Sequence, residues 1–391
     1  MALDMIFTSE SVTPGHPDKL CDQISDAAID AYLRQDSGAR AVVECAVATG
    51  VVFVAARFAT EATIDLPSLA RRVIADAGYL DERFDARSCS ILTSLAELPM
   101  SMREPPLTDP DDEAIECRVA QDQANVFGYA CRDTPELMPL PISLAHRLAR
   151  ALDRARAGLA WLTPDGKTQV SVEYRNSHPV RIHGISLTSA VATDTLSTEV
   201  NECLRTVTID AFADDDLKPD GQTEIHINIG GPYEAGGPAR HAGLTGRKNG
   251  IDTYGEIARQ SGAALSGKDP SRIDRIGAYA ARHAAKNVVA AGLAERCEVH
   301  LAYAIGRSRP LSLSVETFRS GRIPDDKIAD RLTRMIDFRP AAIGHRFALR
   351  TQPALADSAG FYRPLAVYGH FGRPELNLPW EVTDLAAALR E

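Results

Sequence analysis

Several features that would place a protein outside the cytoplasm are scarce or missing in this sequence. Its seven cysteines are scattered, odd in number and form no Cys-x-x-Cys pair, so we expect reduced thiols, with neither disulfides nor a zinc site. No uninterrupted apolar run is long enough to span a bilayer. The opening MALDMIFTSE has neither a basic nor an apolar leader segment. These absences predict a cytoplasmic protein with no membrane association.

An excess of positive charge is also missing. Asp and Glu number 53 against 43 Lys and Arg, which gives a formal net charge of -10. A general attraction to nucleic acid or to an anionic membrane is therefore not expected. Any phosphate site must be formed locally. With 391 residues, 45% of them hydrophobic, the chain is long enough to bury a sizeable core in two or three domains.

The order of the predicted elements is mixed, which indicates an α+β fold. Apolar residues at helical spacing predict a helix from Pro17, with aspartates on another of its faces. The Val- and Ala-rich run 41–58 is interrupted by Thr49 and Gly50, which predicts a β-hairpin. A further helix is expected from Pro270, with Asp269 as its N-cap.

Two stretches without regular periodicity are predicted to separate domains. Residues 97–116 are rich in proline and acidic side chains, which is typical of a surface loop and makes this stretch a candidate lid. Residues 230–243 are rich in glycine and form a second expected junction. We therefore expect an N-terminal domain at about 1–105, a central domain at 116–231 and a C-terminal domain at 232–391. A segment from one of these ranges can still pack into a neighbouring domain.

Three glycine-containing turns carry side chains suited to phosphate. Residues 15–19 (GHPDK) and 266–275 (SGKDPSRIDR) each precede or begin a predicted helix, where free N–H groups favour an anion. Residues 243–248 (GLTGRK) present two adjacent cations without the spacing of a Walker motif. Asp18 and Asp274 suit Mg²⁺, which takes one or two carboxylates and shares its other positions with phosphate and water. Taken alone, the first turn is more typical of a capped helix, the acidic residues of the third are more typical of a cap and a solvated face, and the second is as consistent with a solvated basic turn.

Taken together and in this order, the segments resemble the S-adenosylmethionine synthetase (methionine adenosyltransferase) family. The resemblance covers nearly the whole chain. The matching runs are 7–19 (FTSESVTPGHPDK), 127–131 (FGYAC), 134–141 (TPELMPLP), 243–248, 252–255 (DTYG), 266–275, 278–282 (AYAAR), 368–373 (YGHFGR) and 379–381 (PWE).

The resemblance implies three similar α+β domains around a pseudo-threefold axis, each with a sheet backed by helices. It also implies a homodimer or dimer of dimers with active sites between subunits. In the family reaction the methionine sulfur attacks C5′ of ATP and expels the whole triphosphate, which is then hydrolysed. The implied cofactors are Mg²⁺ (or Mn²⁺) and K⁺. Because a thioether is already nucleophilic, such a site needs mainly positioning and charge neutralisation.

The resemblance also assigns roles residue by residue. The positions expected to neutralise the triphosphate are His16, Lys167, Arg247 and Lys268. Asp18 and Asp274 are expected to hold Mg²⁺, and Glu44 matches the potassium-site carboxylate. The further ATP-site and active-site positions are Glu10, Asp122, Asp165, Lys248 and Arg272, the last of which stands where the family has a lysine.

The departures from the family fall on the side of the acceptor. Arg57 stands where the family has a glutamate near the methionine, and His241 stands where it has an aspartate. Ile227 aligns with the aromatic residue that stacks on adenine. These three positions predict a divergent acceptor pocket that takes methionine or a related thioether.

Three functions therefore stay open from the sequence. The leading one is an ATP-dependent adenosyltransferase that forms S-adenosylmethionine or a related sulfonium. The second is an ATP- or triphosphate-cleaving hydrolase of the same fold, in which water replaces sulfur. The third is a non-catalytic ATP-binding paralogue, against which the intact set of triphosphate residues argues.

Overall fold

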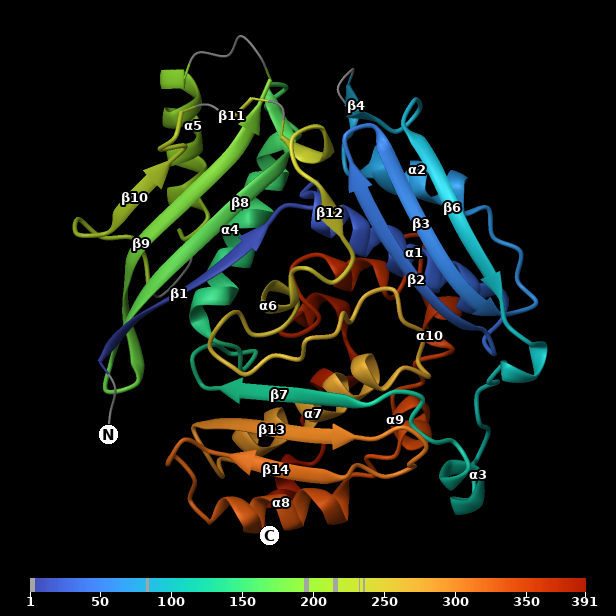
Figure 1. Cartoon of the computed structure of the whole chain (residues 1–391). Coiled ribbons are helices and arrows are strands. Elements are labelled where there is room, and N and C mark those ends of the chain that lie inside the picture. Colours follow the sequence, from blue (N-terminus) through green and yellow to red (C-terminus); the bar gives the residue numbers. More distant parts are fainter. Residues whose placement is uncertain (1–3, 82–83, 193–196, 214–216, 232, 235) are drawn as a thin grey trace.

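The computed structural model describes residues 4–81, 84–192, 197–213, 217–231, 233–234 and 236–391. Three main sheets surround a common centre and a small two-stranded sheet lies at the edge of the molecule (Figure 1). Each main sheet is backed by helices on one face, so the predicted α+β fold of three similar domains is confirmed.

The N-terminal sheet has the strand order β12, β2, β3 and β6, with helices α1 and α2 behind it (Figure 1). Its elements are α1 (Pro17–Gln35), β2 (Arg40–Ala48), β3 (Val51–Ala59), α2 (Leu66–Asp76), β6 (Ser90–Glu97) and β12 (Gly243–Leu244). Strands β2 and β3 pair antiparallel and form the predicted hairpin, with Thr49 in the left-handed conformation at its turn.

The central sheet has the order β1, β8, β9 and β10, with β11 also paired to β9. Helices α4 and α5 pack against each other, and α4 packs on β1 and β8. The elements are β1 (Met5–Val12), α4 (Leu140–Arg156), β8 (Leu162–Arg175), β9 (His178–Val191), α5 (Ser197–Asp210), β10 (Glu224–Ile227) and β11 (Tyr233–Glu234).

The C-terminal sheet has the order β14, β13 and β7, with helix α7 packed on β7 and β13. Its elements are β7 (Ala124–Cys131), α7 (Ile273–Ala290), β13 (Arg296–Tyr303), β14 (Ser312–Glu316) and α8 (Asp325–Met335). Shorter elements are β4 (Leu80–Asp81), β5 (Phe84–Asp85), η1 (Met100–Met102), α3 (Asp112–Glu116), η2 (Gly237–Ala239), α6 (Asn249–Asp252), α9 (Pro340–Arg346), α10 (Gln352–Leu355), η3 (Arg363–Ala366), η4 (Pro374–Leu376), η5 (Pro379–Glu381) and α11 (Ala386–Arg390).

Each main sheet contains a strand from a distant part of the chain. Strand β1 joins the central sheet through β8, β7 joins the C-terminal sheet through β13, and β12 joins the N-terminal sheet through β2. The chain therefore crosses between the predicted domains, and each main sheet includes one strand from outside its own predicted sequence range. Positions 232 and 235 of the second predicted junction lie outside the described residues.

Among the residues that the structure describes, the buried apolar side chains form two clusters. The larger runs without a break from the N-terminal sheet and α1 to α7 and the C-terminal sheet. The smaller lies between the central sheet and its helices α4 and α5. The N-terminal and C-terminal sheets thus share one core, and the central sheet has its own.

Helix α1 carries buried aspartates at every fourth position, and each accepts backbone N–H groups from another segment. All four are at most 5% exposed. The donors are the N–H groups of Leu244 to Asp18, Gly246 to Asp22, Gly267 to Asp26, and Phe361, Tyr362 and Arg363 to Asp30. We call these four residues the aspartate row. Through these hydrogen bonds the row attaches three loops that are distant in sequence, around residues 244–246, 267 and 361–363, to helix α1.

The predicted N-cap of the helix after Pro270 was wrong. Helix α7 begins at Ile273, and its N-cap residue is Arg272. The carboxylate of Asp269 instead accepts the N–H of Ala41 at 2.8 Å and that of Ser271 at 2.6 Å. This side chain therefore fixes the 266–269 turn against strand β2 and is not available to cap the helix.

The predicted surface loop 97–116 contains η1 and α3 and is attached to the N-terminal domain. Arg103 forms an ion pair with Asp36 at 2.6 Å, and the N–H of Glu104 donates to the carbonyl of Gly38. A lid role for this segment stays a prediction.

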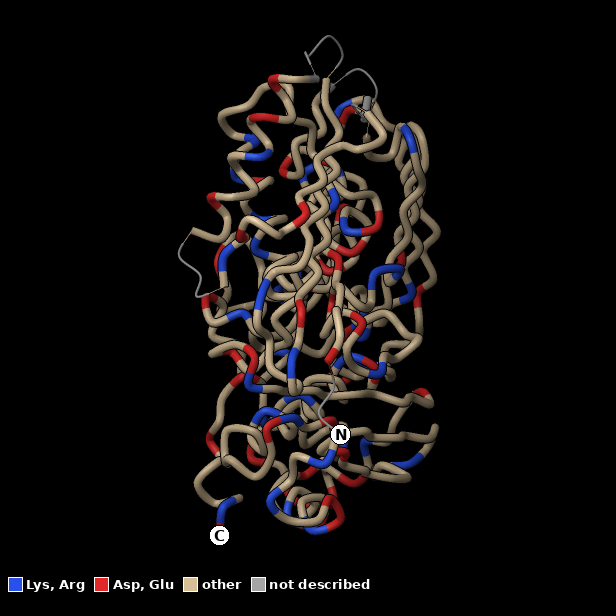
Figure 2. The backbone as a smooth tube through the Cα atoms, turned by 90° about the vertical axis from the view of Figure 1, so that its left-hand side faces the viewer, with Lys and Arg blue, Asp and Glu red and all other residues tan. Residues whose placement is uncertain are grey.

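Lys and Arg residues are interspersed with Asp and Glu residues along the described part of the tube in Figure 2. A search of the described residues finds no helix that combines the length and the apolar character needed to cross a membrane. All seven cysteines are free thiols.

Within the aspartate row, we expect Asp26 to contribute strongly to the stability of the fold, because it forms a fully buried ion pair with Arg275. Replacing Asp26 by Ala leaves the buried guanidinium without its counter-charge, so we expect the free energy of unfolding to fall by about 3–5 kcal/mol. Urea denaturation measures this. The matched control is Asp65→Ala at the exposed N-cap of α2, where we expect a much smaller loss. Equal losses for the two variants would contradict the role given to the row.

Candidate active site

The first predicted turn and the start of strand β8 lie against each other. The hydroxyl of Thr13 donates to the carbonyl of Pro164 at 2.6 Å and accepts the N–H of Gly166 at 2.8 Å. Gly15 is required here, because a Cβ atom at that position would lie 2.3 Å from Pro164. This close approach brings the side chains of β8 to the N-terminus of α1.

His16 caps helix α1 and is almost completely buried. Its Nδ1 accepts the N–H of Asp18 at 3.2 Å, which places the ring proton on Nε2. Burial lowers the pKa of His16 to about 3, with the positive charges of Lys248 and Lys167 acting in the same direction. The neutral ring therefore offers an N–H donor to a ligand.

Asp165 and His241 complete this group. His241 Nε2 lies 2.9 Å from Asp165 Oδ2, which also accepts the N–H of Gly237 at 2.8 Å. Burial acts to raise the pKa of Asp165, but the hydrogen bond from His241 and the N–H of Gly237 hold it below its ordinary value. Oδ1 of Asp165 is buried and has no hydrogen-bond partner among the described residues. It is available to accept a hydrogen bond from a ligand.

The donor atoms of His16, Asp165 and His241 lie within 4.8 Å of one another, a spacing also open to a metal ion. The hydrogen bonds argue for a different ligand. A metal on His16 Nε2 would require the ring proton to move to Nδ1, which already accepts an N–H from Asp18. Lys167 and Lys248 also bring positive charge near the ring. This end of the site is suited to a polar anionic molecule.

The second predicted turn brings two cations to the same helix end. Arg247 Nε lies 3.6 Å from Asp18, and its side chain is 54% exposed. Lys248 Nζ lies 3.3 Å from Glu10 on strand β1. The aspartate row fixes the backbone of this turn, while Arg247 keeps its charge open to solvent and to a ligand.

The third predicted turn reaches α1 one helical turn further along. The N–H of Gly267 donates to Asp26, and Gly267 has a φ of +77° with no room for a Cβ beside the carbonyl of Val43. Lys268 Nζ lies 2.7 Å from Asp274 Oδ2. The second and third turns are therefore attached to neighbouring positions of the row on the same helix.

Arg272, at the end of the third turn, forms an ion pair with Asp122, with 3.6 Å between the guanidinium nitrogen and the carboxylate oxygen. The structure thus joins most of the predicted site residues in pairs or groups around α1. Lys167, on strand β8, belongs to the group of His16 because its charge acts on that ring.

Three predicted positions lie elsewhere in the single chain. Glu44 and Arg57 lie on the exposed face of strands β2 and β3, and Ile227 packs against the core of the central sheet. Arg57 is opposite Val42 on β2, whereas Gly243, two residues after His241, is opposite Val47. Five steps along the strand correspond to about 16 Å. One chain therefore does not bring Arg57 and His241 into a common pocket.

Sequence reasoning missed the buried charges that support the site. Lys19 is 0% exposed and pairs with Asp22 at 2.9 Å and with Asp252. Burial opposes the charge on Lys19, but the two carboxylates outweigh it and raise the pKa of the ammonium. The available signal was the spacing of the aspartates, each four residues from the next along one helix.

The fold and this site together define a class of protein: three α+β domains in which distant turns that carry cationic residues are attached to one helix. Comparison with known sequences makes the assignment specific. Sequence profiles of the S-adenosylmethionine synthetase family match residues 4–99 (N-terminal domain), 118–233 (central domain) and 235–382 (C-terminal domain). The chain belongs to the S-adenosylmethionine synthetase family.

Two relatives from Synechococcus show how far the similarity extends. An S-adenosylmethionine synthase from Synechococcus sp. (strain CC9311) is 48% identical over 405 residues, which cover 99% of this chain and 96% of the relative. One from Synechococcus sp. (strain JA-3-3Ab) is 46% identical over 409 residues, covering 99% and 97%. The predicted enzyme class, a methionine adenosyltransferase-like transferase, is confirmed by these matches.

Proposed function

We propose that this protein transfers the adenosyl group of ATP to a thioether, forming S-adenosylmethionine or a closely related sulfonium and releasing triphosphate or its hydrolysis products. The observation that carries the proposal is the shared attachment of two cationic turns to α1 through Asp22 and Asp26. The names of the relatives support the same reaction for this chain.

The arrangement suits the departure of a triphosphate from a primary carbon. Negative charge develops on the leaving oxygen, and fixed donors and cations stabilise it most when they need no reorganisation. The Nε2–H of His16 and the side chains of Lys167, Arg247 and Lys268 are the proposed partners of the triphosphate. The sulfur nucleophile carries no proton to remove, so alignment with C5′ supplies much of the remaining rate enhancement.

The carboxylates of Asp18 and Asp274 fit a hard divalent cation. Each uses one oxygen in the contacts described above and has acceptor capacity on the other. We propose that they hold Mg²⁺ or Mn²⁺, whose role when bound is to neutralise the triphosphate. Glu44, exposed on the open face of β2, is the proposed ligand for K⁺.

The triphosphate assignment is tested by Lys268→Ala and Asp274→Asn. Because fixed charge at a leaving group is typically worth a few kcal/mol, we expect each to reduce ATP turnover about 100-fold or more while the unfolding midpoint changes little. Lys327→Ala, an exposed lysine on α8, is the matched control and should turn over ATP like the parent. Parent-like turnover by Lys268→Ala would remove this residue from the site. Activity that survives chelation of divalent cations would remove the metal role.

A homodimer is the proposed assembly, and the open face of the N-terminal sheet is its proposed interface. This face exposes Phe53, Leu92 and Leu244, which are 42–55% exposed, whereas helices α1 and α2 cover the opposite face (Figure 1). Exposed apolar patches of this kind are typical of protein interfaces. A second copy placed on it would cover Glu44 and Arg57 and bring them toward the site of its neighbour.

The dimer is tested by Phe53→Asp combined with Leu92→Asp, two neighbouring residues on the open face. Two charges in an apolar interface should convert a dimer to a monomer by light scattering and abolish turnover, since the site then lacks residues from the second subunit. Leu355→Asp, at a leucine that is 79% exposed outside this face, is the control and should leave a dimer. An active monomer of the parent protein would contradict the proposal.

The acceptor is proposed to differ from methionine in its charged groups. Arg57 is exposed on the proposed interface, and His241 is held by Asp165. A carboxylate at each position would attract the methionine ammonium, whereas Arg57 repels it and suits an acidic group through its planar fork. The thioether substrate is therefore one with an additional acidic group or without an ammonium.

The pair Arg57→Glu and His241→Asp tests this proposal. We expect the double variant to raise kcat/KM for methionine about tenfold or more, because an unfavourable charge is replaced by a favourable one, while the affinity for ATP changes little. Steady-state kinetics with methionine as the varied substrate measure the effect. If the parent already uses methionine with a KM in the usual range of about 1 μM to 1 mM, the acceptor pocket is rearranged but not altered in specificity.

A second candidate function, hydrolysis of ATP or triphosphate, is favoured by one observation. The hydrogen bond from His241 to Asp165 resembles the orientation of a general base by a carboxylate. Chromatography after incubation with ATP, Mg²⁺ and K⁺, with and without a thioether, separates the alternatives. A sulfonium product supports the transferase, adenosine or diphosphate without an acceptor supports the hydrolase, and unchanged ATP supports a non-catalytic protein.

A further inference from the structure

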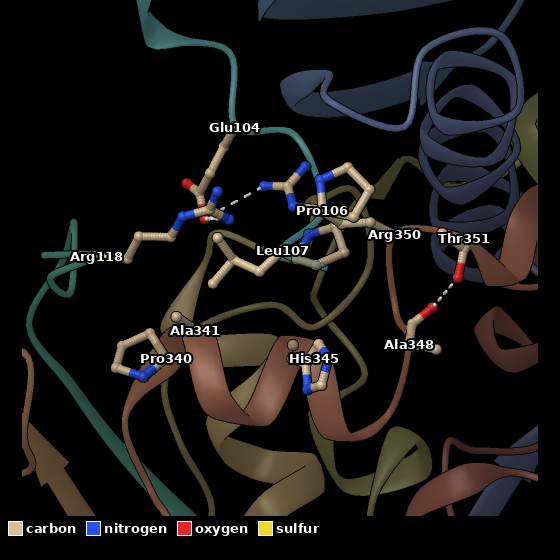
Figure 3. Close-up of a pocket in the computed structure, with 12 residues that line it drawn as sticks. Glu104, Pro106, Leu107, Arg118, Pro340, Ala341, His345, Ala348, Arg350 and Thr351 are labelled. Atoms are coloured by element: carbon tan, nitrogen blue, oxygen red, sulfur yellow. Dashed lines mark hydrogen bonds and ion pairs between the residues drawn. The ribbon is translucent and has the colours of Figure 1, made fainter. Parts of the chain in front are cut away.

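A pocket outside the candidate active site lies between residues 104–107 and helix α9 (Figure 3). Its volume is about 210 Å³. Pro106 and Leu107 form one apolar side, and Pro340 and Ala341 of α9 form the other. The pocket is small and mostly apolar, which is typical of sites for small molecules that carry a few well-placed polar groups.

One end of the pocket is strongly polar. Glu104 Oε1 lies 3.5 Å from Arg118 and 3.7 Å from Arg350, so a single carboxylate oxygen is shared by two guanidinium groups at long distances (Figure 3). The side chain of Arg350 is 7% exposed and that of Glu104 is 22% exposed. The guanidinium of Arg350 is therefore buried in the wall of the pocket, whereas the carboxylate of Glu104 is more exposed and makes only long ion pairs.

The position of Arg350 is fixed from behind. It donates to the carbonyl of Ala39 at 2.9 Å and lies 3.4 Å from Asp269. Burial lowers the pKa of Arg118, and the neighbouring Arg350 acts in the same direction. Two arginines therefore face two carboxylates, those of Glu104 and Asp269. The two positive charges are balanced by two negative charges only while a carboxylate, here that of Glu104, lies between Arg118 and Arg350.

This balance defines which ligand the pocket accepts. An additional anion would leave an unpaired negative charge, whereas an anion that displaces Glu104 keeps the balance and can form shorter, paired hydrogen bonds with Arg118. Asp269 is 1% exposed and accepts two backbone N–H groups, so it is not the group displaced. The apolar walls favour a hydrocarbon body on the incoming molecule.

We propose that this pocket binds a small apolar carboxylic acid, whose carboxylate replaces that of Glu104 between Arg118 and Arg350 while its hydrocarbon part lies against Leu107 and Pro340. The site goes beyond the proposed reaction, because none of the described residues that line it is proposed above to bind ATP, a metal ion or the thioether. Pro270 forms part of the wall, so a bound ligand contacts the turn that carries Lys268.

Isothermal titration of the full chain with 4-methylpentanoate tests the proposal, with the neutral amide of the same acid as the matched ligand. The acid should bind at least about tenfold more tightly than the amide, since only the acid forms charge-assisted hydrogen bonds with the arginines. Glu104→Gln removes the competing carboxylate and should tighten binding of the acid about tenfold. A residue that merely shaped the pocket would not produce a gain.

Three further variants control the result. Arg118→Leu should lose the preference for the acid, whereas Arg154→Leu, an exposed arginine on α4, should keep it. Lys268→Ala should bind the acid like the parent, which separates this pocket from the triphosphate site. Equal affinities for acid and amide, weaker binding by Glu104→Gln, or no binding to either protein would overturn the proposal.

Discussion

The aspartate row on helix α1 is the constraint on which the rest of the structure depends. A carboxylate without a partner is costly to bury, so Asp18, Asp22, Asp26 and Asp30 require donors wherever the fold places them. They find these donors in the backbone N–H groups of three loops that follow α1 by more than 200 residues. The helix therefore determines the positions of loops that local sequence leaves undefined.

This constraint explains how cations can converge in a protein with a net charge of -10. The negative charge of the row is satisfied by backbone N–H groups and by the buried cations Lys19 and Arg275. The side chains of Arg247 and Lys268 follow residues that the row holds, and each cation lies near a carboxylate, that of Asp18 or Asp274. The row thus fixes the backbone of the two turns and does not itself bind their cations.

Local structure could be predicted where the residues that determine it are neighbours in the sequence. Pro17 at the start of a helix and the Thr49 and Gly50 turn of the hairpin were both predicted, because each depends on neighbouring residues. Asp269 was assigned as an N-cap because the sequence did not reveal its hydrogen bond to Ala41, 228 residues away. The roles of the site residues came from the family resemblance. Only the structure shows that His16, Asp165 and His241 meet and that Arg57 lies apart from them.

Hydrogen exchange at the backbone amides of Gly246 and Gly267 in the ligand-free protein tests the central claim most directly. If the aspartate row fixes both turns in advance, these amides should exchange as slowly as those of the sheet strands, and an ATP analogue should change them little. Replacing Asp22 by Asn should speed exchange at Gly246 more than at Gly267. Exchange at the rate of an unstructured loop until the nucleotide binds would contradict the account, because the ligand rather than helix α1 would then organise the site.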